Sequence, residues 1–394
     1  MTTETKPTAL SAQELTRYSR HLILPEVGRE GQERLRRASV LIVGAGGLGS
    51  PAALYLAAAG IGRIGMADFD NVEEHNLQRQ ILHGSSDIGR PKVESAAARL
   101  TDLNPYIRIS SHPDGLSPDN STALFSKYDL ILDGTDNFAT RYLNNDSAFF
   151  AGKPLVYGSI FRFEGQASLF HPTDGTPCYR CLFPDPPPPG KIPNCADAGV
   201  LGALPGAIGS FQAIEAIKHL LGIGENLRGR LLIFDALAMT FRTINIKKDP
   251  DCPLCGGQPR ISRIDPENYA FSCQQEADME SGNGKGGPPL EVTVEETRGL
   301  VKRDSGDLDL LDVREPYEVE ICRIAGAREI PMDHIPQRID ELPRDRPLLV
   351  YCHHGMRSLH VVKYLRDRGF PLAQSVRGGI DAWAREIDSG MARY

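Results

Sequence analysis

Two segments of the chain carry residue types at spacings that suit chemistry. Residues 40–50 read VLIVGAGGLGS, in which Gly44, Gly46 and Gly49 form a G-x-G-x-x-G pattern between a strand-like and a helix-like run. Residues 351–358 read YCHHGMRS and place Cys352 in a short loop ahead of another helix-like run. The first segment suggests nucleotide chemistry and the second suggests sulfur chemistry. A chain with both is expected to activate a substrate and then hand sulfur to it.

The glycine-rich segment predicts a nucleotide site. Glycines permit a tight turn and a close backbone approach to phosphate, and the free N–H groups at the start of a helix attract anions. Gly47 lies within the same turn. Asp68 ends the next strand-like run, where a carboxylate can bind ribose hydroxyls. By itself this pattern fits NAD about as well as ATP.

The stretch that follows favours ATP. It supplies Asn76, Arg79 and Gln80, and Lys92 at the expected start of a helix, with Pro91 in its first turn. Cleavage of ATP between its α and β phosphates needs cations, usually with magnesium, to hold the departing pyrophosphate. The diphosphate of NAD needs few cations, because it is not cleaved. A lone arginine or lysine is ordinarily a solvated surface charge. The interpretation therefore depends on all of these residues occurring together in this order. Asp133 and Asp136 follow another strand-like run, where a magnesium-binding carboxylate is expected.

Two C-x-x-C pairs predict a zinc site. They are Cys178 with Cys181 and Cys252 with Cys255, and each short loop can present two thiolates to one tetrahedral ion. Four cysteines fill the coordination sphere, so the site is expected to be structural and to tie two segments together. Redox dithiols or free thiols are the alternatives.

The remaining cysteines outside the C-terminal loop are harder to interpret. Cys195 lies in NCADAGVLG, just after the proline-rich PDPPPPG, and is either a nucleophile near the nucleotide site or an ordinary thiol. Cys273 and Cys322 have no supporting context, and no chemical role is expected of them.

The loop that begins at Cys352 fits sulfur better than phosphate. Loop N–H groups and a helix start stabilise a thiolate, and Arg357 and two histidines are expected to add positive charge. Cysteine phosphatases use C-x5-R, whereas here only four residues separate Cys352 from Arg357. The shorter loop forms a smaller ring of backbone N–H groups, which suits a single persulfide sulfur. The alternative interpretation is a buried, inert cysteine. Arg314, upstream in LLDVREPYEV, is expected to order the fold rather than react.

Length and patterning predict a two-domain α/β protein. The chain has 394 residues, of which 41% are hydrophobic and 24% charged. From residue 39 to about 248, strand-like runs alternate with helix-like runs, which predicts a largely parallel sheet covered by helices. Residues 279–289 are polar and rich in glycine and proline, which predicts a flexible linker to a second, smaller α/β unit.

Charge and hydropathy exclude some partners. The net charge is −7 with no basic block, so neither nucleic acid nor an anionic membrane is an expected partner. The start of the chain is polar, and no apolar run reaches the ~18 residues of a membrane helix. A cytoplasmic location is therefore expected, in which cysteines serve as ligands or nucleophiles rather than disulfides.

The motifs resemble two known families. Residues 10–256 resemble the MoeB/ThiF family, the bacterial relatives of ubiquitin-activating enzymes, and residues 291–394 resemble a rhodanese domain. The first resemblance is carried by RYSRHLILPEVG, GAGGLGS, DFDNVEEHNLQRQ, GRPKVES, DGTDNFATR, CYRC, NCADAGVLG and CPLC. The second is carried by LLDVREPYE, RIAGAREIP, YCHHGMRS and VRGGIDAW, with one departure at CRIAGA, where many rhodaneses have a Gly-His pair.

The order of the two parts is similar to that of the fused, MoeZ-like adenylyltransferase/sulfurtransferases. It implies a Rossmann-like ubiquitin-activating-type adenylation domain with structural zinc at 1–256, a flexible linker at 257–290 and a smaller α/β rhodanese domain at 291–394. It also implies a homodimer that uses ATP to adenylate the C-terminal Gly-Gly of a ubiquitin-like sulfur-carrier protein and then makes a thiocarboxylate. The sulfur donor is expected to be a cysteine desulfurase or thiosulfate.

The resemblance also implies roles for individual residues. Arg20, in RYSR, would enter the ATP site of the other subunit. Cys195 matches a cysteine whose role differs between family members, and Cys352 matches the persulfide cysteine. The residues expected to bind Mg-ATP are Gly46, Asp68, Asn76, Arg79, Lys92 and Asp136. An NAD oxidoreductase with a rhodanese tail and a non-catalytic scaffold are the competing interpretations.

Overall fold

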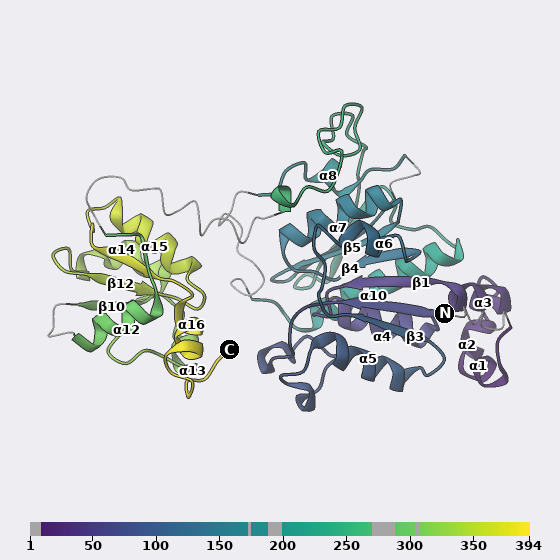
Figure 1. The fold of residues 1–394 in the computed structure, drawn as a ribbon. Helices are drawn as coiled ribbons and strands as arrows, with labels where there is room; N and C mark the ends of the chain where they lie inside the picture. The colour runs from purple at the N-terminus through teal and green to yellow at the C-terminus, as the bar shows by residue number, and fades with distance from the viewer. Residues whose placement is uncertain (1–8, 172–174, 188–198, 270–287, 304–307) are drawn as a thin grey trace. The chain divides into compact units, whose positions relative to one another are not determined.

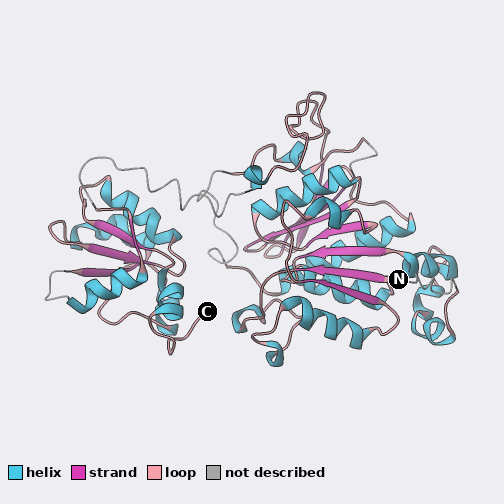
Figure 2. Ribbon diagram, in the orientation of Figure 1, coloured by secondary structure: helices cyan, strands magenta, loops and turns pink. Residues whose placement is uncertain are grey.

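The computed structural model describes residues 9–171, 175–187, 199–269, 288–303 and 308–394. The chain separates into two compact units, Met1–Ser272 and Cys273–Tyr394. Each unit has its own sheet with helices on both faces (Figure 1, Figure 2). None of the helices within the described ranges is long and apolar enough to cross a membrane.

The first unit is built on an eight-stranded sheet of order β3-β2-β1-β4-β5-β6-β7-β8. The strands are β1 Ser39–Val43, β2 Arg63–Ala67, β3 Arg108–His112, β4 Leu130–Asp133, β5 Leu155–Phe161, β6 Glu164–Phe170, β7 Arg230–Asp235 and β8 Thr240–Asn245. From β3 to β5 the strands are parallel, which confirms the predicted largely parallel sheet. An antiparallel extension through β6, β7 and β8 was not predicted. The sequence did not reveal β8 because all of its residues are exposed and no alternation marks it.

Helices cover both faces of this sheet. The described α-helices of this unit are α1 Ala12–Arg17, α2 Ser19–Leu22, α3 Gly28–Arg37, α4 Gly49–Ala59, α5 Lys92–Leu103, α6 Ser121–Phe125, α7 Phe138–Ala151, α8 Tyr179–Leu182 and α10 Ala203–Leu221. Helices α4, α5 and α10 lie on one face of the sheet, and α6 and α7 lie on the other (Figure 1). Val40 and Ile42 of β1 pack in the cluster of the first layer, whereas Leu41 and Val43 pack in that of the second. Burial on both faces is why this strand reads as a continuous apolar run.

The second unit has a five-stranded parallel sheet of order β11-β10-β12-β13-β9. Its strands are β9 Glu291–Val292, β10 Asp309–Asp312, β11 Arg328–Glu329, β12 Leu348–Tyr351 and β13 Ala373–Val376. Its α-helices are α12 Val294–Arg303, α13 Pro316–Ile321, α14 Ile335–Arg338, α15 Met356–Arg366 and α16 Gly379–Glu386. The central strand β12 delivers Cys352 to the carboxyl edge of the sheet, directly ahead of α15.

Three boundaries differ from those expected. Residues 257–269, assigned to the linker from the sequence, pack on the first unit, where Tyr269 is 7% exposed and its hydroxyl donates to Asp146 at 2.7 Å. The rest of the expected linker up to residue 287 lies outside the described residues. The sequence predicts one helix from Ser210 and another from near Ser358, whereas α10 begins at Ala203 and α15 begins at Met356.

Candidate functional site

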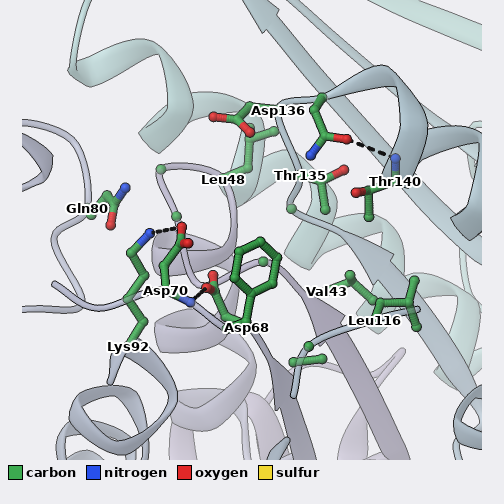
Figure 3. A pocket seen from close by; sticks show the side chains of 18 of the residues that line it. Val43, Leu48, Asp68, Asp70, Gln80, Lys92, Leu116, Thr135, Asp136 and Thr140 are labelled. Carbon is green, nitrogen blue, oxygen red and sulfur yellow. Dashed lines mark hydrogen bonds and ion pairs between the residues drawn. The ribbon is translucent and has the colours of Figure 1, made fainter. Parts of the chain in front are cut away.

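A pocket of about 820 Å³, open to solvent, lies at the carboxyl ends of the parallel strands of the first unit. The chain visits β1, β2 and β3 in one direction and then crosses back to β4, so the loops after β1 and β4 diverge and leave a crevice. Its lining includes Gly44, Gly46, Gly47, Asp68, Phe69, Asp70, Arg79, Gln80, Lys92, Leu116, Thr135, Asp136, Asn137 and Thr140. Figure 3 shows Asp70 and Lys92 pointing toward one another, with Asp68 beside them.

The glycine turn leaves room for a phosphate because its side chains are absent. Gly44 has a φ of +94°, and a Cβ there would lie 2.8 Å from the carbonyl oxygen of Gly134. A Cβ on Gly49 would lie 1.9 Å from the carbonyl oxygen of Gly44. Neither position accepts another residue without moving backbone. The turn thus forms a cradle at the N-terminus of α4, where free N–H groups favour anions.

Asp68 is held in place by the backbone around it. Its carboxylate accepts hydrogen bonds from the N–H of Ala45 at 2.7 Å and from the N–H of Asp70 at 2.9 Å. Burial raises the pKa of Asp68, and the charge of Lys92 opposes that rise. The carboxyl group therefore lies at the end of β2 beside the glycine turn, as a ribose-binding group would.

Lys92 is the most enclosed cation of the pocket lining. It is the first residue of α5, with Pro91 as the N-cap rather than in the first turn. Its side chain is 7% exposed, and Nζ lies 2.8 Å from Asp70 Oδ2, whose side chain is 50% exposed. Arg79 reaches the same pocket while donating to the carbonyl of His75 at 3.3 Å. A buried cation whose carboxylate partner is half-exposed can exchange that partner for a phosphate.

Gln80 adds an unsatisfied acceptor. Its Oε1 is buried and has no hydrogen-bond partner within the described part of the chain. A buried acceptor without a donor is costly, and a bound ligand can supply one. The glycine cradle, the enclosed lysine and this amide together fit a nucleotide with phosphates.

The two acidic candidates after β4 have different environments. Asp136 is exposed and lines the pocket. Asp133 is fully buried and accepts from the N–H and the hydroxyl of Thr135, at 3.0 and 2.6 Å. Burial raises the pKa of Asp133, against the opposing charge of Arg141. Asp136 is therefore the one of the two available to a cation, and Asp133 shapes the loop.

Four cysteine side chains of the first unit form a cluster. Cys178, Cys181, Cys252 and Cys255 place their Sγ atoms within 4.8 Å of one another. Neighbouring sulfurs are 3.4 to 4.0 Å apart. Tetrahedral zinc with Zn–S bonds of about 2.3 Å sets sulfurs about 3.8 Å apart. The spacing fits zinc, and it is too long for disulfides, whose S–S bonds are about 2.05 Å.

Cys352 is enclosed in the second unit. It is 1% exposed, and its Sγ accepts from the N–H of Gly355 at 3.1 Å. Gly355 has a φ of +96° and is the N-cap of α15, which turns the loop so that this N–H faces the sulfur. The geometry matches the expected N–H-lined loop at a helix start.

The charges around this loop differ from those expected. Arg357 donates to both carboxylate oxygens of Glu318, at 2.7 and 2.6 Å. Burial raises the pKa of Glu318, but Arg357 and the N–H of Glu315 outweigh it and bring the pKa to about 2. Burial, reinforced by His354, lowers the pKa of His353 to about 4. The expectation of positive charge is thus corrected for His353, which is neutral near pH 7, while Arg357 is a cation paired with Glu318.

Arg314 has the ordering role expected of it. It is 1% exposed and donates to Asp312 at 2.9 and 2.6 Å, and to the carbonyl of Cys322 at 2.8 Å. These bonds connect the end of β10 to the segment after α13.

Comparisons with known proteins follow this division of the chain. Residues 18–254 match the sequence model of the ThiF family, and residues 294–386 match that of the rhodanese-like domain. The chain belongs to the ThiF family. The ThiF match spans the nucleotide pocket and three of the four clustered cysteines, and the rhodanese match spans Cys352.

Relatives of this ThiF family chain match it over most of their own length. A Mycobacterium tuberculosis protein named probable adenylyltransferase/sulfurtransferase MoeZ is 49% identical over 392 residues, covering 98% of this chain and 97% of that protein. The adenylyltransferase and sulfurtransferase MOCS3 of Sus scrofa is 43% identical, covering 98% and 89%. Among solved structures, E. coli MccB with ATP has a TM-score of 0.53 at 24% identity, covering 62% and 75%. The similarity to MccB is a similarity of fold alone.

Some of the residues expected in the ATP site of the ThiF unit are not in its lining. Asn76 is 5% exposed and its amide lies 2.8 Å from His75 Nε2, and the described lining does not include it. Arg20 is exposed on α2 and is likewise not among the described residues that line the pocket of its own chain. Cys195 lies outside the described residues, as does Cys273.

Part of the pocket lining was not predicted from the sequence. The loop after β4 contributes Thr135 and Asn137, the first turn of α7 contributes Thr140, and the loops after β2 and β3 contribute Phe69 and Leu116. Asn137 caps α7, accepting from the N–H of Thr140 at 2.9 Å. An asparagine just before a helical run was the available signal. The proximity of these loops depends on strand order, which the sequence did not reveal.

Proposed function

We propose that this protein adenylates the C-terminal Gly-Gly of a ubiquitin-like sulfur-carrier protein with ATP and then converts it to a thiocarboxylate. The observation that carries the proposal is one chain holding both a phosphate cradle beside enclosed Lys92 and an enclosed Cys352 with an N–H directed at its sulfur. Relatives that match over nearly the whole chain are named adenylyltransferases and sulfurtransferases.

In the first reaction the carrier carboxylate attacks the α-phosphate of ATP. A P–O bond forms to the carrier, and pyrophosphate leaves with the electron pair of the bond that breaks. Lys92 and Arg79 lie where they can offset the charge of that leaving group, together with the N–H groups of the glycine turn. Asp68 would bind the ribose, and Gln80 Oε1 would accept from a hydroxyl or amino group of the nucleotide. Asp136 is the carboxylate that would hold magnesium, whose charge would assist this step.

In the second reaction the Cys352 thiolate takes sulfur from thiosulfate or a cysteine desulfurase. The outer persulfide sulfur then attacks the acyl carbon of the adenylate, and AMP leaves. The product is an acyl disulfide. A second thiol attacks the sulfur of Cys352, and the thiocarboxylate leaves with the electron pair. Cys195 is a candidate for that thiol, and an external reductant is the other, which is also needed to reduce the disulfide that forms.

The proposed enzyme is a homodimer in which Arg20 acts on the partner's pocket. Arg20 is exposed on α2, and the residues after that helix include Ile23, which is 69% exposed, and Leu24, which is 48% exposed. Exposed apolar side chains beside an exposed arginine suit a surface that a second copy covers. Mixing Arg20→Ala with Lys92→Ala tests this. A heterodimer has one pocket with both residues intact, so activity returns if Arg20 acts across the interface and stays absent if it acts within its own chain.

The overall proposal is tested with a purified carrier that ends in Gly-Gly. Carrier-dependent ATP–pyrophosphate exchange reports adenylation, and a mass change from oxygen to sulfur at the carrier terminus reports thiocarboxylate. Removing the terminal glycine should abolish both. Tight NAD binding without ATP binding would support the oxidoreductase alternative. Absence of exchange with every Gly-Gly carrier of the source organism, in protein that binds ATP, would favour the scaffold.

A further inference from the structure

Two fully buried hydroxyl groups lie directly behind Cys352. Ser358 is the third residue of α15 and Ser375 lies in β13, and their Oγ atoms are 2.9 Å apart. Ser358 Oγ is 3.6 Å from Cys352 Sγ and 3.0 Å from the carbonyl oxygen of Gly355. The sulfur therefore has a hydroxyl within hydrogen-bond reach, in addition to the N–H of Gly355.

The pair can serve two states of the sulfur without moving a heavy atom. Either hydroxyl can donate to the other. When Ser375 donates to Ser358, the Ser358 proton is left to point either at Gly355 O or at Cys352 Sγ. The carbonyl of Gly355 keeps a donor in both cases, because it also accepts from the N–H of Leu359 at 3.0 Å. Rotation about the C–O bond of Ser358 is enough to supply or withdraw a hydrogen bond from the sulfur.

The surroundings make that hydrogen bond important. Cys352 belongs to an apolar cluster with Val350, Val361 and Val362, so an anionic sulfur there is poorly solvated. Ser375 is held opposite Val350 by the parallel register of β12 and β13, and the turn at Gly355 brings Ser358 back under the loop. The supporting elements are a strand and a helix, which position a side chain more firmly than a loop does.

We propose that Ser358 is a catalytic residue of sulfur transfer, donating to Cys352 Sγ while that sulfur is anionic, and that Ser375 is its positioning residue. This rests on the proposed function of Cys352 as the sulfur acceptor. With thiosulfate, a bond forms from Sγ to the outer sulfur, the S–S bond of thiosulfate breaks, and sulfite leaves with the electron pair. The negative charge moves to the outer sulfur, and Ser358 turns to Gly355 O. When cyanide takes the outer sulfur as thiocyanate, the thiolate returns and Ser358 donates to it again.

The test is the pH profile of thiosulfate–cyanide sulfur transfer by the full chain. Ser358→Ala removes a donor to an anion, so a smaller fraction of Cys352 is thiolate at a given pH. The acid limb should move to higher pH by about one unit, with activity at pH 7 falling about tenfold and recovering at alkaline pH. Ser375→Ala should move the acid limb in the same direction by a smaller amount, with activity at pH 7 falling about threefold. Ser375→Thr keeps the hydroxyl on a strand and should restore the wild-type profile.

Neighbouring ionisable groups are unchanged in these variants. They are His353, His354 and Arg357 on the loop and α15, Glu318 on α13, Asp381 on α16, and Tyr394. The matched control is Thr297→Val, which removes a fully buried hydroxyl that donates to the carbonyl of Thr293, away from the sulfur. It should leave the profile in place.

The outcomes separate the two proposals. Wild-type protein that transfers no sulfur, or Cys352→Ala that transfers it normally, defeats the proposed function. An acid limb unchanged in Ser358→Ala, with wild-type protein active, overturns the role of Ser358 alone. Equal loss of activity at every pH, with thermal destabilisation like that of Thr297→Val, would make the hydroxyl structural and overturns it as well.

Discussion

The phenol ring of Tyr394 stacks on the imidazole of His353, with centroids 4.2 Å apart and an interplanar angle of 9°. The same phenol accepts from Arg314 at 2.8 Å and donates to Glu318 at 2.9 Å. Since His353 directly follows Cys352, Tyr394 connects the sulfur loop to the ion pairs beneath it. The burial that this stack requires also keeps His353 neutral.

The stability of the rhodanese unit should fall as the pH drops below the ordinary pKa of a histidine side chain. The pKa of His353 is about 4 in the folded chain and about 6.5 when unfolded, so the unfolded chain takes up the proton first. The stabilisation is complete above pH 6.5 and is lost between 6.5 and 4. His353→Phe keeps a ring against Tyr394 and should flatten that decline.

The reporter is the fluorescence of Trp383, the one tryptophan of the sequence, which is buried on α16 of this unit. Its thermal transition can be followed in the full chain. His360→Phe is the control, since His360 is exposed on α15. Equal slopes in wild type and His353→Phe would contradict the assignment.

Glu318→Gln should destabilise the same unit by about 3 kcal/mol, because it leaves the guanidinium of Arg357 enclosed without a carboxylate. Urea unfolding followed by Trp383 measures this. Glu341→Gln is the matched control. Glu341 accepts two bonds of 2.7 Å from Arg338, but both groups are exposed, so no measurable change is expected. Similar behaviour of the two variants would show that burial of the Glu318 pair has no energetic effect.

One zinc ion should copurify with each chain. Cys252→Ser should lower the zinc content and the unfolding temperature of the ThiF unit, because the metal ties Cys178 and Cys181 to a segment far along the sequence. Cys322→Ser, which changes a cysteine outside the cluster, should do neither. Metal analysis that finds no zinc in protein prepared without chelators would refute the site.

Lys92→Ala or Arg79→Ala should reduce carrier-dependent ATP–pyrophosphate exchange about 100-fold or more, because each removes a cation that is proposed to offset the charge of the leaving group. Thiosulfate–cyanide sulfur transfer should be unaffected, since it needs only the other unit. Arg90→Ala serves as control, because Arg90 pairs with Asp87 and is not among the described residues of the pocket lining. Near wild-type exchange in either pocket variant would remove its assigned role.

Cys352→Ala should still adenylate the carrier but should form no thiocarboxylate from thiosulfate. Cys195→Ala should show a milder defect that added thiol repairs, since a resolving thiol is replaceable and a loop-held persulfide is not. Mass spectrometry of the carrier reads both. Unrepairable loss in Cys195→Ala would instead make that residue an obligatory acyl acceptor.

The strand and helix pattern of the nucleotide half could be predicted because burial on both faces leaves continuous apolar runs, as in β1. Strand β8 could not, because its exposed residues carry no such pattern. The same contrast holds at the sites. Gly44 and Gly49 are recognisable from spacing, whereas Asp133 and Asp136 look equivalent in sequence and only their packing separates a buried, Thr135-bonded carboxylate from one at the pocket.

The sequence by itself determined which chemistries the chain carries, because glycine turns, C-x-x-C pairs and the four-residue spacing from Cys352 to Arg357 are local properties of covalent structure. Only the tertiary structure decided the partners of the charges. Arg357 meets Glu318 from α13, Lys92 meets Asp70, and Ser358 meets Ser375 from β13. The physical reason is that a hydrogen bond or ion pair forms with whatever group packing brings within about 3 Å, and that group comes from a segment distant in sequence or from another element of the fold.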